Sequence, residues 1–140
     1  MSDVRVLFVD DEPDFLETLL KRMQKRNLAA FGAKSGEEAL AWLAAHPADV
    51  VVLDVRMQGM DGIAALRAIK GAHPLIEVIL LTGHANLEIA RDCLQAGAFD
   101  YLMKPVNLDE LLYKIEDAYQ KKALQEKKIR SLEEVIGTRT

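Results

Sequence analysis

Reactive polar side chains directly follow short apolar runs at four places in this chain. Asp10 and Asp11 follow residues 4–9, Asp54 follows 50–53, Thr82 follows 78–81, and Lys104 follows 101–103. If these runs are parallel strands of one sheet, the polar groups emerge at the same edge and meet in one cleft. Three carboxylates, a hydroxyl and an ammonium group there would suit holding a divalent cation and moving a phosphoryl group onto a carboxylate.

The acidic pair Asp10 and Asp11 is the first candidate for cation binding. Carboxylates at the end of a buried strand are costly unless a positive charge compensates them. Mg²⁺ can do so, because it prefers one or two carboxylates together with waters and phosphate oxygens. Taken alone, the pair is equally compatible with two loop acids that cap the helix expected from Pro13.

Asp54 directly follows the most apolar of the runs and is a candidate nucleophile. A carboxylate can attack phosphorus and form an acyl phosphate. Thr82 can donate a hydrogen bond to a phosphoryl oxygen, and Lys104 can pair with Asp54 before the reaction and with phosphate after it. The Lys104-Pro105 bond is compatible with a cis peptide, which the sequence alone does not establish.

The rest of the chain must form the elements that bring these groups together. Strand-like runs alternate with helix-like runs, and the strands are expected near 4–9, 28–33, 50–53, 77–81 and 99–103. The alternation predicts an α/β fold, a five-stranded parallel sheet of order 2-1-3-4-5 that is doubly wound with five helices. Ser35, Asn86 and Asn107 are predicted to cap helices. A dinucleotide-binding sheet is the alternative, but no Gly-x-Gly-x-x-Gly follows the first strand.

Length and composition limit the classes of function. The 140 residues are half apolar and amount to one domain, which can bury a core of ordinary size. The net charge of -4 argues against nucleic-acid binding. Cys93 is the single cysteine, so neither a disulfide framework nor a thiolate zinc site is expected. The absence of a signal peptide and of a membrane-length apolar run favours a cytoplasmic protein without membrane contact.

The candidate groups and their neighbours together resemble the receiver domain of two-component response regulators. The matching strings are Val-Asp-Asp-Glu at 9–12, Leu-Asp-Val-Arg-Met at 53–57, Thr-Gly at 82–83 and Ala-Gly-Ala-Phe-Asp-Tyr-Leu-Met-Lys-Pro at 96–105. The resemblance covers about residues 4–120, assigned here as a receiver domain over 1–120, and implies the flavodoxin-like receiver fold.

The resemblance also implies a reaction and a partner. Asp54 would accept a phosphoryl group from a phosphohistidine of a sensor histidine kinase. Mg²⁺ would be held by Asp10, Asp11, Asp54 and the backbone carbonyl of Arg56, while Thr82 and Lys104 would contact the phosphoryl oxygens. The chain would then be a signalling domain and not an enzyme, with only self-phosphorylation and self-dephosphorylation expected.

Five further assignments concern how such a switch would work. By the resemblance, Thr82 and Tyr101 would rearrange on phosphorylation and reshape the face formed by the fourth helix, the fifth strand and the fifth helix. Gln58 departs from the family pattern, which often has Pro there, so we expect a looser loop after Asp54. Arg56 and His84 would flank the path of an attacking water and tune the lifetime of the acyl phosphate; an exposed loop histidine is the alternative for His84.

The last part of the chain continues a helical pattern beyond the expected fold. Apolar and polar residues recur at spacings of four and three in the order Leu111, Ile115, Ala118, Lys122, Gln125, Ile129, Leu132, Ile136, and Gly137 is expected to end the helix. This is a heptad pattern with two polar members. We interpret residues 121–140 as a helical extension that forms a coiled-coil homodimer and leads to an effector domain absent from this chain; a solvated, fraying helix is the alternative. The strings Leu-Thr-Gly-His and Asp-Val-Arg-Met resemble transcription activators with an ATPase output.

Two other functions compete with the phospho-acceptor switch. A phosphohydrolase with an Asp nucleophile on a similar sheet usually has a second Asp two residues later as general acid, but here that residue is Arg56, which stays protonated. A docking module with a decayed site is disfavoured, because all of the acids, Thr82 and Lys104 are present.

Overall fold

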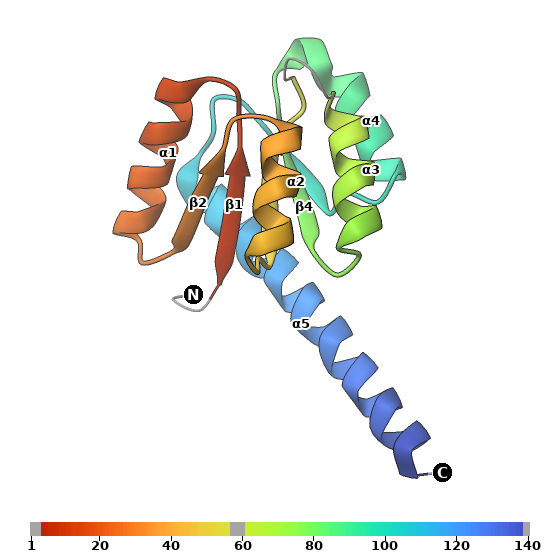
Figure 1. Ribbon diagram of the computed structural model, residues 1–140. Helices are drawn as coiled ribbons and strands as arrows, with labels where there is room; N and C mark the ends of the chain where they lie inside the picture. Colours follow the sequence, from red (N-terminus) through yellow and green to blue (C-terminus); the bar gives the residue numbers. More distant parts are fainter. Residues whose placement is uncertain (1–3, 57–60, 139–140) are drawn as a thin grey trace.

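Five parallel strands form one sheet in the order β2-β1-β3-β4-β5, and this confirms the topology predicted from the sequence (Figure 1). The computed structural model describes residues 4–56 and 61–138. The strands are β1 (Arg5–Val9), β2 (Ala29–Ala33), β3 (Val50–Asp54), β4 (Glu77–Thr82) and β5 (Asp100–Met103). The helices are α1 (Pro13–Lys25), α2 (Gly36–Ala45), α3 (Gly62–Ala72), α4 (Leu87–Gln95) and α5 (Leu108–Thr138), with a short 3₁₀ turn η1 (His84–Asn86) before α4.

Helices cover both faces of the sheet, so the central strands are buried on both sides. Alternate residues of a strand point to opposite faces. In β1, Leu7 and Val9 therefore pack on the face covered by α2, α3 and α4, whereas Val6 and Phe8 pack on the face covered by α1 and α5. The same alternation runs through β3 and β4, which explains why their sequences are continuous apolar runs.

Helix starts follow local capping chemistry at most of the predicted positions. The Ser35 Oγ accepts a hydrogen bond from the backbone N–H of Glu38 at 3.0 Å, and Asn107 Oδ1 accepts one from Glu110 at 3.0 Å. The predicted side-chain cap at Asn86 is wrong: this residue has φ -116 and ψ 17, and its side chain makes no cap hydrogen bond. An N-cap side chain works from an extended backbone, which Asn86 lacks because it is the last residue of η1.

The register of the strands aligns the carboxyl ends of β1, β3, β4 and β5. Val9 pairs with Leu53, Asp54 with Leu81, and Thr82 with Met103, so the residues that follow these pairs meet at one edge. Gly62 starts α3 close to the end of β3, where an added Cβ would lie 2.8 Å from the Val55 Cα. Only glycine lets the backbone after Asp54 approach this closely.

Helix α5 begins on the sheet and continues away from it as a single helix (Figure 1). It extends one residue past Gly137, where the sequence was expected to end it. The first three members of the heptad pattern, Leu111, Ile115 and Ala118, are fully buried against the domain's own sheet. These three members therefore belong to the core of the domain, because a helix that packs on its own sheet has the same period as a coiled coil. The predicted coiled-coil extension, residues 121–140, begins after them.

The later members of the pattern are exposed. Ile129, Leu132 and Ile136 lie on the part of α5 that extends beyond the sheet, and they are between 41 and 63% exposed. No helix in the described part of the chain is both long and apolar enough to cross a membrane.

Candidate functional site

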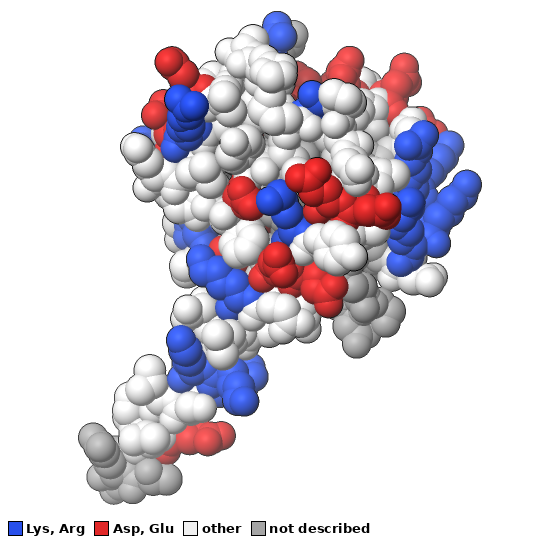
Figure 2. All heavy atoms as spheres, turned by 180° about the vertical axis from the view of Figure 1, so that it is seen from behind, with Lys and Arg blue, Asp and Glu red and all other residues white. Residues whose placement is uncertain are grey.

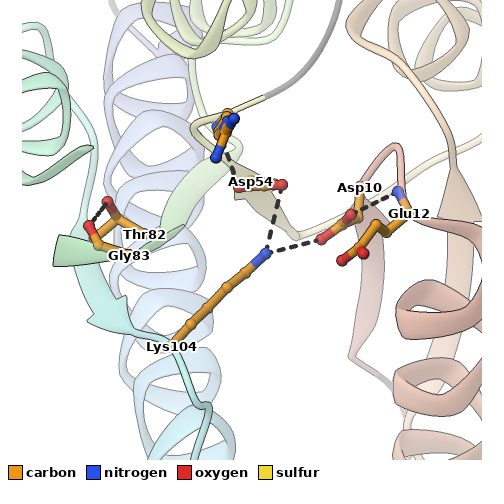
Figure 3. A network of polar contacts seen from close by, with 7 residues as sticks. Asp10, Glu12, Asp54, Thr82, Gly83 and Lys104 are labelled. Carbon is orange, nitrogen blue, oxygen red and sulfur yellow. Dashed lines mark hydrogen bonds and ion pairs between the residues drawn. The ribbon is translucent and has the colours of Figure 1, made fainter. Parts of the chain in front are cut away.

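Three carboxylates converge at the carboxyl edge of the sheet. Two of them, Asp10 and Asp54, are shown with Lys104 in Figure 3. The possible ligand oxygens of Asp10, Asp11 and Asp54 all lie within 4.8 Å of one another. Asp10 and Asp54 are only 3 and 5% exposed. Backbone donors orient both: Glu12 N–H donates to Asp10 Oδ1 at 2.9 Å, and Arg56 N–H donates to Asp54 Oδ1 at 3.1 Å. The side chains are thus fixed while their outer oxygens stay directed into the site.

Lys104 provides one ammonium group to two of these carboxylates. Its Nζ lies 3.5 Å from Asp10 Oδ2 and 3.5 Å from Asp54 Oδ2. The Lys104 N–H donates to the carbonyl of Thr82 at 2.8 Å, which ties the end of β5 to the end of β4. The peptide bond from Lys104 to Pro105 is cis. The base of the Lys104 side chain is therefore held by the sheet, and its charge is placed between Asp10 and Asp54.

The charges of this edge are only partly compensated. Burial raises the pKa of Asp10 and of Asp54 above the ordinary aspartate value, and the backbone hydrogen bonds and Lys104 only partly oppose it. The negative charge of Asp10 raises the pKa of Asp54 further. Carboxylates whose ionised forms are disfavoured in this way gain most from an added cation. The donor set consists of hard carboxylate oxygens, which fits Mg²⁺ better than a soft metal.

A cavity of about 490 Å³ opens over this edge. Its lining residues are Asp11, Glu12, Asp54, Arg56, Gly83, Asn86 and Lys104. Asp54 lines the cavity, whereas Asp10 is buried and is not among the lining residues. A slightly larger hollow of about 540 Å³ lies between the ends of α2 and α3, but none of its lining residues is a carboxylate or lysine. The chemistry of the side chains, and not the size of the hollow, identifies the first as the candidate site.

Thr82 and Tyr101 lie near the site without entering the cavity. Thr82 is fully buried, and its Oγ1 donates to the carbonyl of Gly83 at 3.0 Å (Figure 3). Tyr101 is half-buried in β5 and packs against the core formed with α2, α3 and α4. The Thr82 hydroxyl must leave the Gly83 carbonyl before it can reach an atom in the cavity.

Arg56 and His84, the two residues expected to tune the lifetime of the acyl phosphate, differ in their position relative to the cavity. Arg56 lines the cavity and is exposed. His84 is exposed in the η1 turn and is not among the residues lining the cavity. Gln58, for which we expected a looser loop, lies outside the described residues.

Three residues at the site were not found by sequence reasoning as site residues. Glu12 and Asn86 line the cavity. The Phe15 ring lies under Lys104, with the Nζ 4.7 Å from the ring centroid. Asn86 was predicted only as a helix cap. Phe15 lies in α1, and helical spacing alone does not tell whether a side chain of a helix reaches the edge of a sheet.

Comparisons with known proteins identify the family of the chain. The family model described as the response regulator receiver domain matches residues 6–116. The transcriptional regulator NtrC of Salmonella typhimurium is 41% identical over 113 residues, which are 81% of this chain and 24% of NtrC. The regulatory protein AtoC of Escherichia coli is 37% identical over 134 residues, which are 96% of this chain and 29% of AtoC.

The fold comparison gives the same result. A receiver domain from Clostridium thermocellum superposes with a TM-score of 0.83 at 33% identity, over 87% of this chain and 98% of that structure. The present chain thus matches nearly all of a solved receiver domain, but it spans only about a quarter of the two curated regulators.

Proposed function

Because the chain belongs to the response regulator receiver domain family, we propose that it is a phospho-acceptor switch in which Asp54 receives a phosphoryl group. The observation that carries the proposal is the position of the Asp54 carboxylate. It is the buried carboxylate that lines the cavity, it lies 3.5 Å from the Lys104 ammonium, and one of its oxygens is fixed by the Arg56 N–H. A nucleophile needs this combination of fixed orientation and access to solvent.

The donor is a phosphohistidine of a sensor histidine kinase. An Asp54 oxygen attacks phosphorus, so that a P–O bond forms while the P–N bond breaks and its electron pair stays on the imidazole nitrogen of the kinase. Lys104 offsets the negative charge on the phosphoryl oxygens during this transfer, and the Thr82 hydroxyl donates to one of them afterwards. Lys104 is well suited, because its ammonium already lies between Asp10 and Asp54.

Asp10, Asp11, Asp54 and the Arg56 backbone carbonyl would hold Mg²⁺. The fit is supported by the three carboxylates, whose ligand oxygens lie within 4.8 Å of one another, and by the burial that raises the pKa of Asp10 and of Asp54. When bound, the cation supplies positive charge to the phosphoryl oxygens. The protein's own contribution is to hold the carboxylates ready, through the Glu12 and Arg56 N–H groups.

Phosphorylation would move Thr82 away from the Gly83 carbonyl and towards the cavity, and Tyr101 would turn into the space released. Phosphorylated Asp54 carries about two negative charges and three acceptor oxygens, which gives the Thr82 hydroxyl a stronger acceptor than a backbone carbonyl. This would reshape the face formed by α4, β5 and α5. Arg56, exposed at the cavity, and His84 would modulate how long the acyl phosphate persists.

An Asp-nucleophile phosphohydrolase on a similar fold is the alternative function. It is disfavoured because the residue two positions after Asp54 is Arg56, whose guanidinium stays protonated and cannot act as a general acid at neutral pH. Chemistry is thus limited to self-phosphorylation and self-dephosphorylation.

The output proposed for this receiver is an ATPase domain of a transcription regulator. The resemblance of the chain to NtrC and AtoC supports a receiver placed before an ATPase output domain in a cytoplasmic transcription regulator. The exposed Ile129, Leu132 and Ile136 of α5 support a homodimer formed by the helical extension over residues 121–140, with no direct role for nucleic acid or membrane in this part.

Incubation with acetyl phosphate and Mg²⁺, followed by intact mass spectrometry, tests the proposal. We expect a gain of about 80 Da that requires Mg²⁺ and is lost in Asp54→Asn. Asp92→Asn, in the exposed face of α4, is the matched control and should be labelled as well as the wild type. Multiple turnover of generic phosphate esters would instead support the phosphohydrolase, and labelling that persists in Asp54→Asn would contradict the proposed acceptor.

A further inference from the structure

Helix α5 leaves the sheet at a point where its contacts change from apolar to ionic. Ala118 is its last fully buried residue. Four residues later, Lys122 Nζ lies 3.1 Å from Asp49 Oδ1, and the two side chains are only 12 and 18% exposed. Glu126, one turn further along α5, lies 3.2 Å from the same Nζ. Lys122 is thus engaged by its own domain, although the heptad pattern would assign it to a dimer seam.

Asp49 is itself fixed to the amino edge of the sheet. Its Oδ2 accepts a hydrogen bond from the Arg5 N–H at 2.9 Å, and its own N–H donates to the Arg5 carbonyl at 2.8 Å. Asp49 directly precedes β3. The carboxylate that binds Lys122 is therefore held by the starts of β1 and β3 and is not a mobile surface group.

A second ion pair joins the neighbouring residue of α5 to the next strand. Glu77, the first residue of β4, is 4% exposed. Its Oε2 lies 3.2 Å from Lys121 Nζ, and its Oε1 lies 3.3 Å from Lys70 Nζ of α3. Lys70 also donates to the carbonyls of Pro74 and Ile76. The buried Glu77 carboxylate thus lies between two lysines, Lys70 and Lys121, where α5 passes the start of β4.

The two contacts restrict different motions of the helix. Lys121 and Lys122 are consecutive, so their side chains leave the helix about 100° apart. One contacts the start of β4 and the other the start of β3, which are adjacent in the sheet. Contacts in two directions would limit both rotation of the helix about its axis and tilting away from the sheet, although the Lys121 side chain is 50% exposed and the Lys122 side chain only 12%. Basic side chains gather where α5 leaves the body of the domain (Figure 2).

We propose that Lys121 and Lys122, with Glu77 and Asp49, form a two-point anchor that fixes the direction in which α5 leaves the domain. The part of α5 beyond residue 122 then moves as one body with β3 and β4, the strands that carry Asp54 and Thr82 at their other ends. The anchor goes beyond the proposed phosphotransfer and does not depend on it.

The competing explanation is that helix continuity and the apolar contacts up to Ala118 are sufficient to direct the extension. The two explanations differ in what loss of the ammonium groups does. If apolar packing suffices, Lys121→Met with Lys122→Met leaves the direction and the stability of α5 beyond residue 118 unchanged. If the anchor directs the helix, the same change lets the helix tilt and its first free turn open.

Distances between two spin labels measure this directly by double electron–electron resonance. The labels are attached through Ala41→Cys in α2 and Glu133→Cys in α5, both exposed, in a Cys93→Ala background, with Cys93→Ser as a second background. An excess of unlabelled chain suppresses distances between copies. The control is Lys127→Met with Lys128→Met, two exposed lysines on the next turns of the same helix. Met and Lys have similar helix propensities, so both double variants remove two ammonium groups without disfavouring the helix.

We expect the anchor variant to broaden and shift the distance distribution, while the control variant reproduces the parent distribution. Amide hydrogen exchange of residues 119–126 should accelerate roughly tenfold in the anchor variant, because a helix segment freed from tertiary contacts opens at low free energy. Asp49→Asn removes the carboxylate that pairs with Lys122, so it should reproduce part of the change in distances and in exchange. Equal distributions and equal exchange in the anchor and control variants would overturn the proposal.

Labelling of Asp54 by acetyl phosphate serves as the independent readout. The anchor lies at the amino edge of the sheet, so its variants should be labelled like the parent. Retained labelling shows that the variant is folded. A chain that is never labelled could still show the change in distances and in exchange expected for the anchor variant. Failure of the anchor and failure of the proposed function are thus distinguishable.

Discussion

The Lys104 Nζ lies 3.5 Å from Asp54 Oδ2 and equally far from Asp10 Oδ2, so one ammonium group serves two buried carboxylates. One positive charge cannot fully compensate two buried negative charges. Burial raises the pKa of both carboxyl groups, and the single ammonium only partly opposes this, so the edge of the sheet is a place for a cation and for phosphate oxygens. The first predictions follow from this imbalance.

Removing the charge of Asp54 should stabilise the cation-free protein. Because burial raises the pKa of Asp54 in the folded state, the folded protein binds this proton more tightly than the unfolded chain does. The stability therefore falls as the pH rises from the ordinary value of 3.8 through the folded-state pKa, and it stays lower above it. At pH 7 with a chelator, we expect the Tm of Asp54→Asn to exceed that of the wild type by a few degrees.

Measuring the two Tm values as a function of pH tests whether the raised pKa of Asp54 causes their difference. The difference in Tm between Asp54→Asn and the wild type should shrink as the pH falls towards 3.8. Glu116→Gln, at an exposed position of α5, should show no such trend. A lower Tm for Asp54→Asn at pH 7 would mean that Lys104 more than compensates the buried charge.

Mg²⁺ should stabilise the wild type through Asp11. A cation that binds only the folded state raises the Tm in proportion to the logarithm of its concentration above the dissociation constant. Asp11 lines the cavity and contributes one of the three clustered carboxylates. We expect Asp11→Asn to weaken the apparent Mg²⁺ affinity by at least about tenfold, as read from Tm against Mg²⁺ concentration. The same Mg²⁺ dependence in Asp11→Asn and in Glu116→Gln would contradict the assigned ligand set.

Loss of Lys104 should slow phosphorylation far more than it destabilises the fold. Its ammonium is the charge nearest Asp54, and removing one such electrostatic group lowers rates by on the order of 100-fold. We expect Lys104→Met to be labelled by acetyl phosphate at about that reduced rate while its circular dichroism spectrum is unchanged. Lys114→Met, which removes an ion pair with Asp100 away from the cavity, is the control. A labelling rate within about twofold of the wild type would show that Lys104 has no part in the transfer.

Phe15 should be energetically coupled to Lys104, because the ammonium lies 4.7 Å from the centre of the ring. Urea unfolding of Phe15→Leu, Lys104→Met and the double variant isolates the interaction. We expect a coupling free energy of about 0.5–1 kcal/mol, typical of a cation–π contact at a partly exposed site. Additive effects would mean that Phe15 contributes only to packing at the edge of the core.

The apolar residues of the α5 extension should determine the oligomeric state. Ile129, Leu132 and Ile136 are exposed and recur at heptad spacing. We expect light scattering to give a dimer mass for the wild type and a monomer mass when the three are replaced by Ser. Replacing Lys127, Lys128 and Glu133, which are also exposed on this part of the helix, by Ser should leave the dimer mass unchanged. A wild type that is monomeric at high micromolar concentration would rule out this dimer.

The sequence was sufficient for the sheet order and for the convergence of the polar groups, because both depend on alternation and on parallel strands sharing one edge. Asp10, Asp54 and Lys104 are far apart in the chain, yet each directly follows a predicted strand, and the register brings them together. The convergence of these polar groups needs no knowledge of side-chain rotamers, so pattern reasoning could find it.

What the sequence did not reveal depends on side-chain direction and on which surface a helix faces. The Thr82 hydroxyl donates to the Gly83 carbonyl, which no spacing predicts. Asn86 lines the cavity instead of capping α4, because the η1 turn changes its backbone conformation. Lys122 binds Asp49 although its position in the heptad pattern suggests a dimer seam, since periodicity identifies a face of a helix but not the partner of that face.

The most direct test of the account is to locate the phosphoryl group by chemical trapping. Treatment with acetyl phosphate and Mg²⁺, reduction of the acyl phosphate by borohydride, and peptide mass mapping convert the modified carboxyl into an alcohol at one position. The account predicts reduction at Asp54, only when Mg²⁺ is present, with Asp10 and Asp11 unmodified. Reduction at Asp10 or Asp11 in place of Asp54, or none in a protein that is folded and binds Mg²⁺, would contradict it.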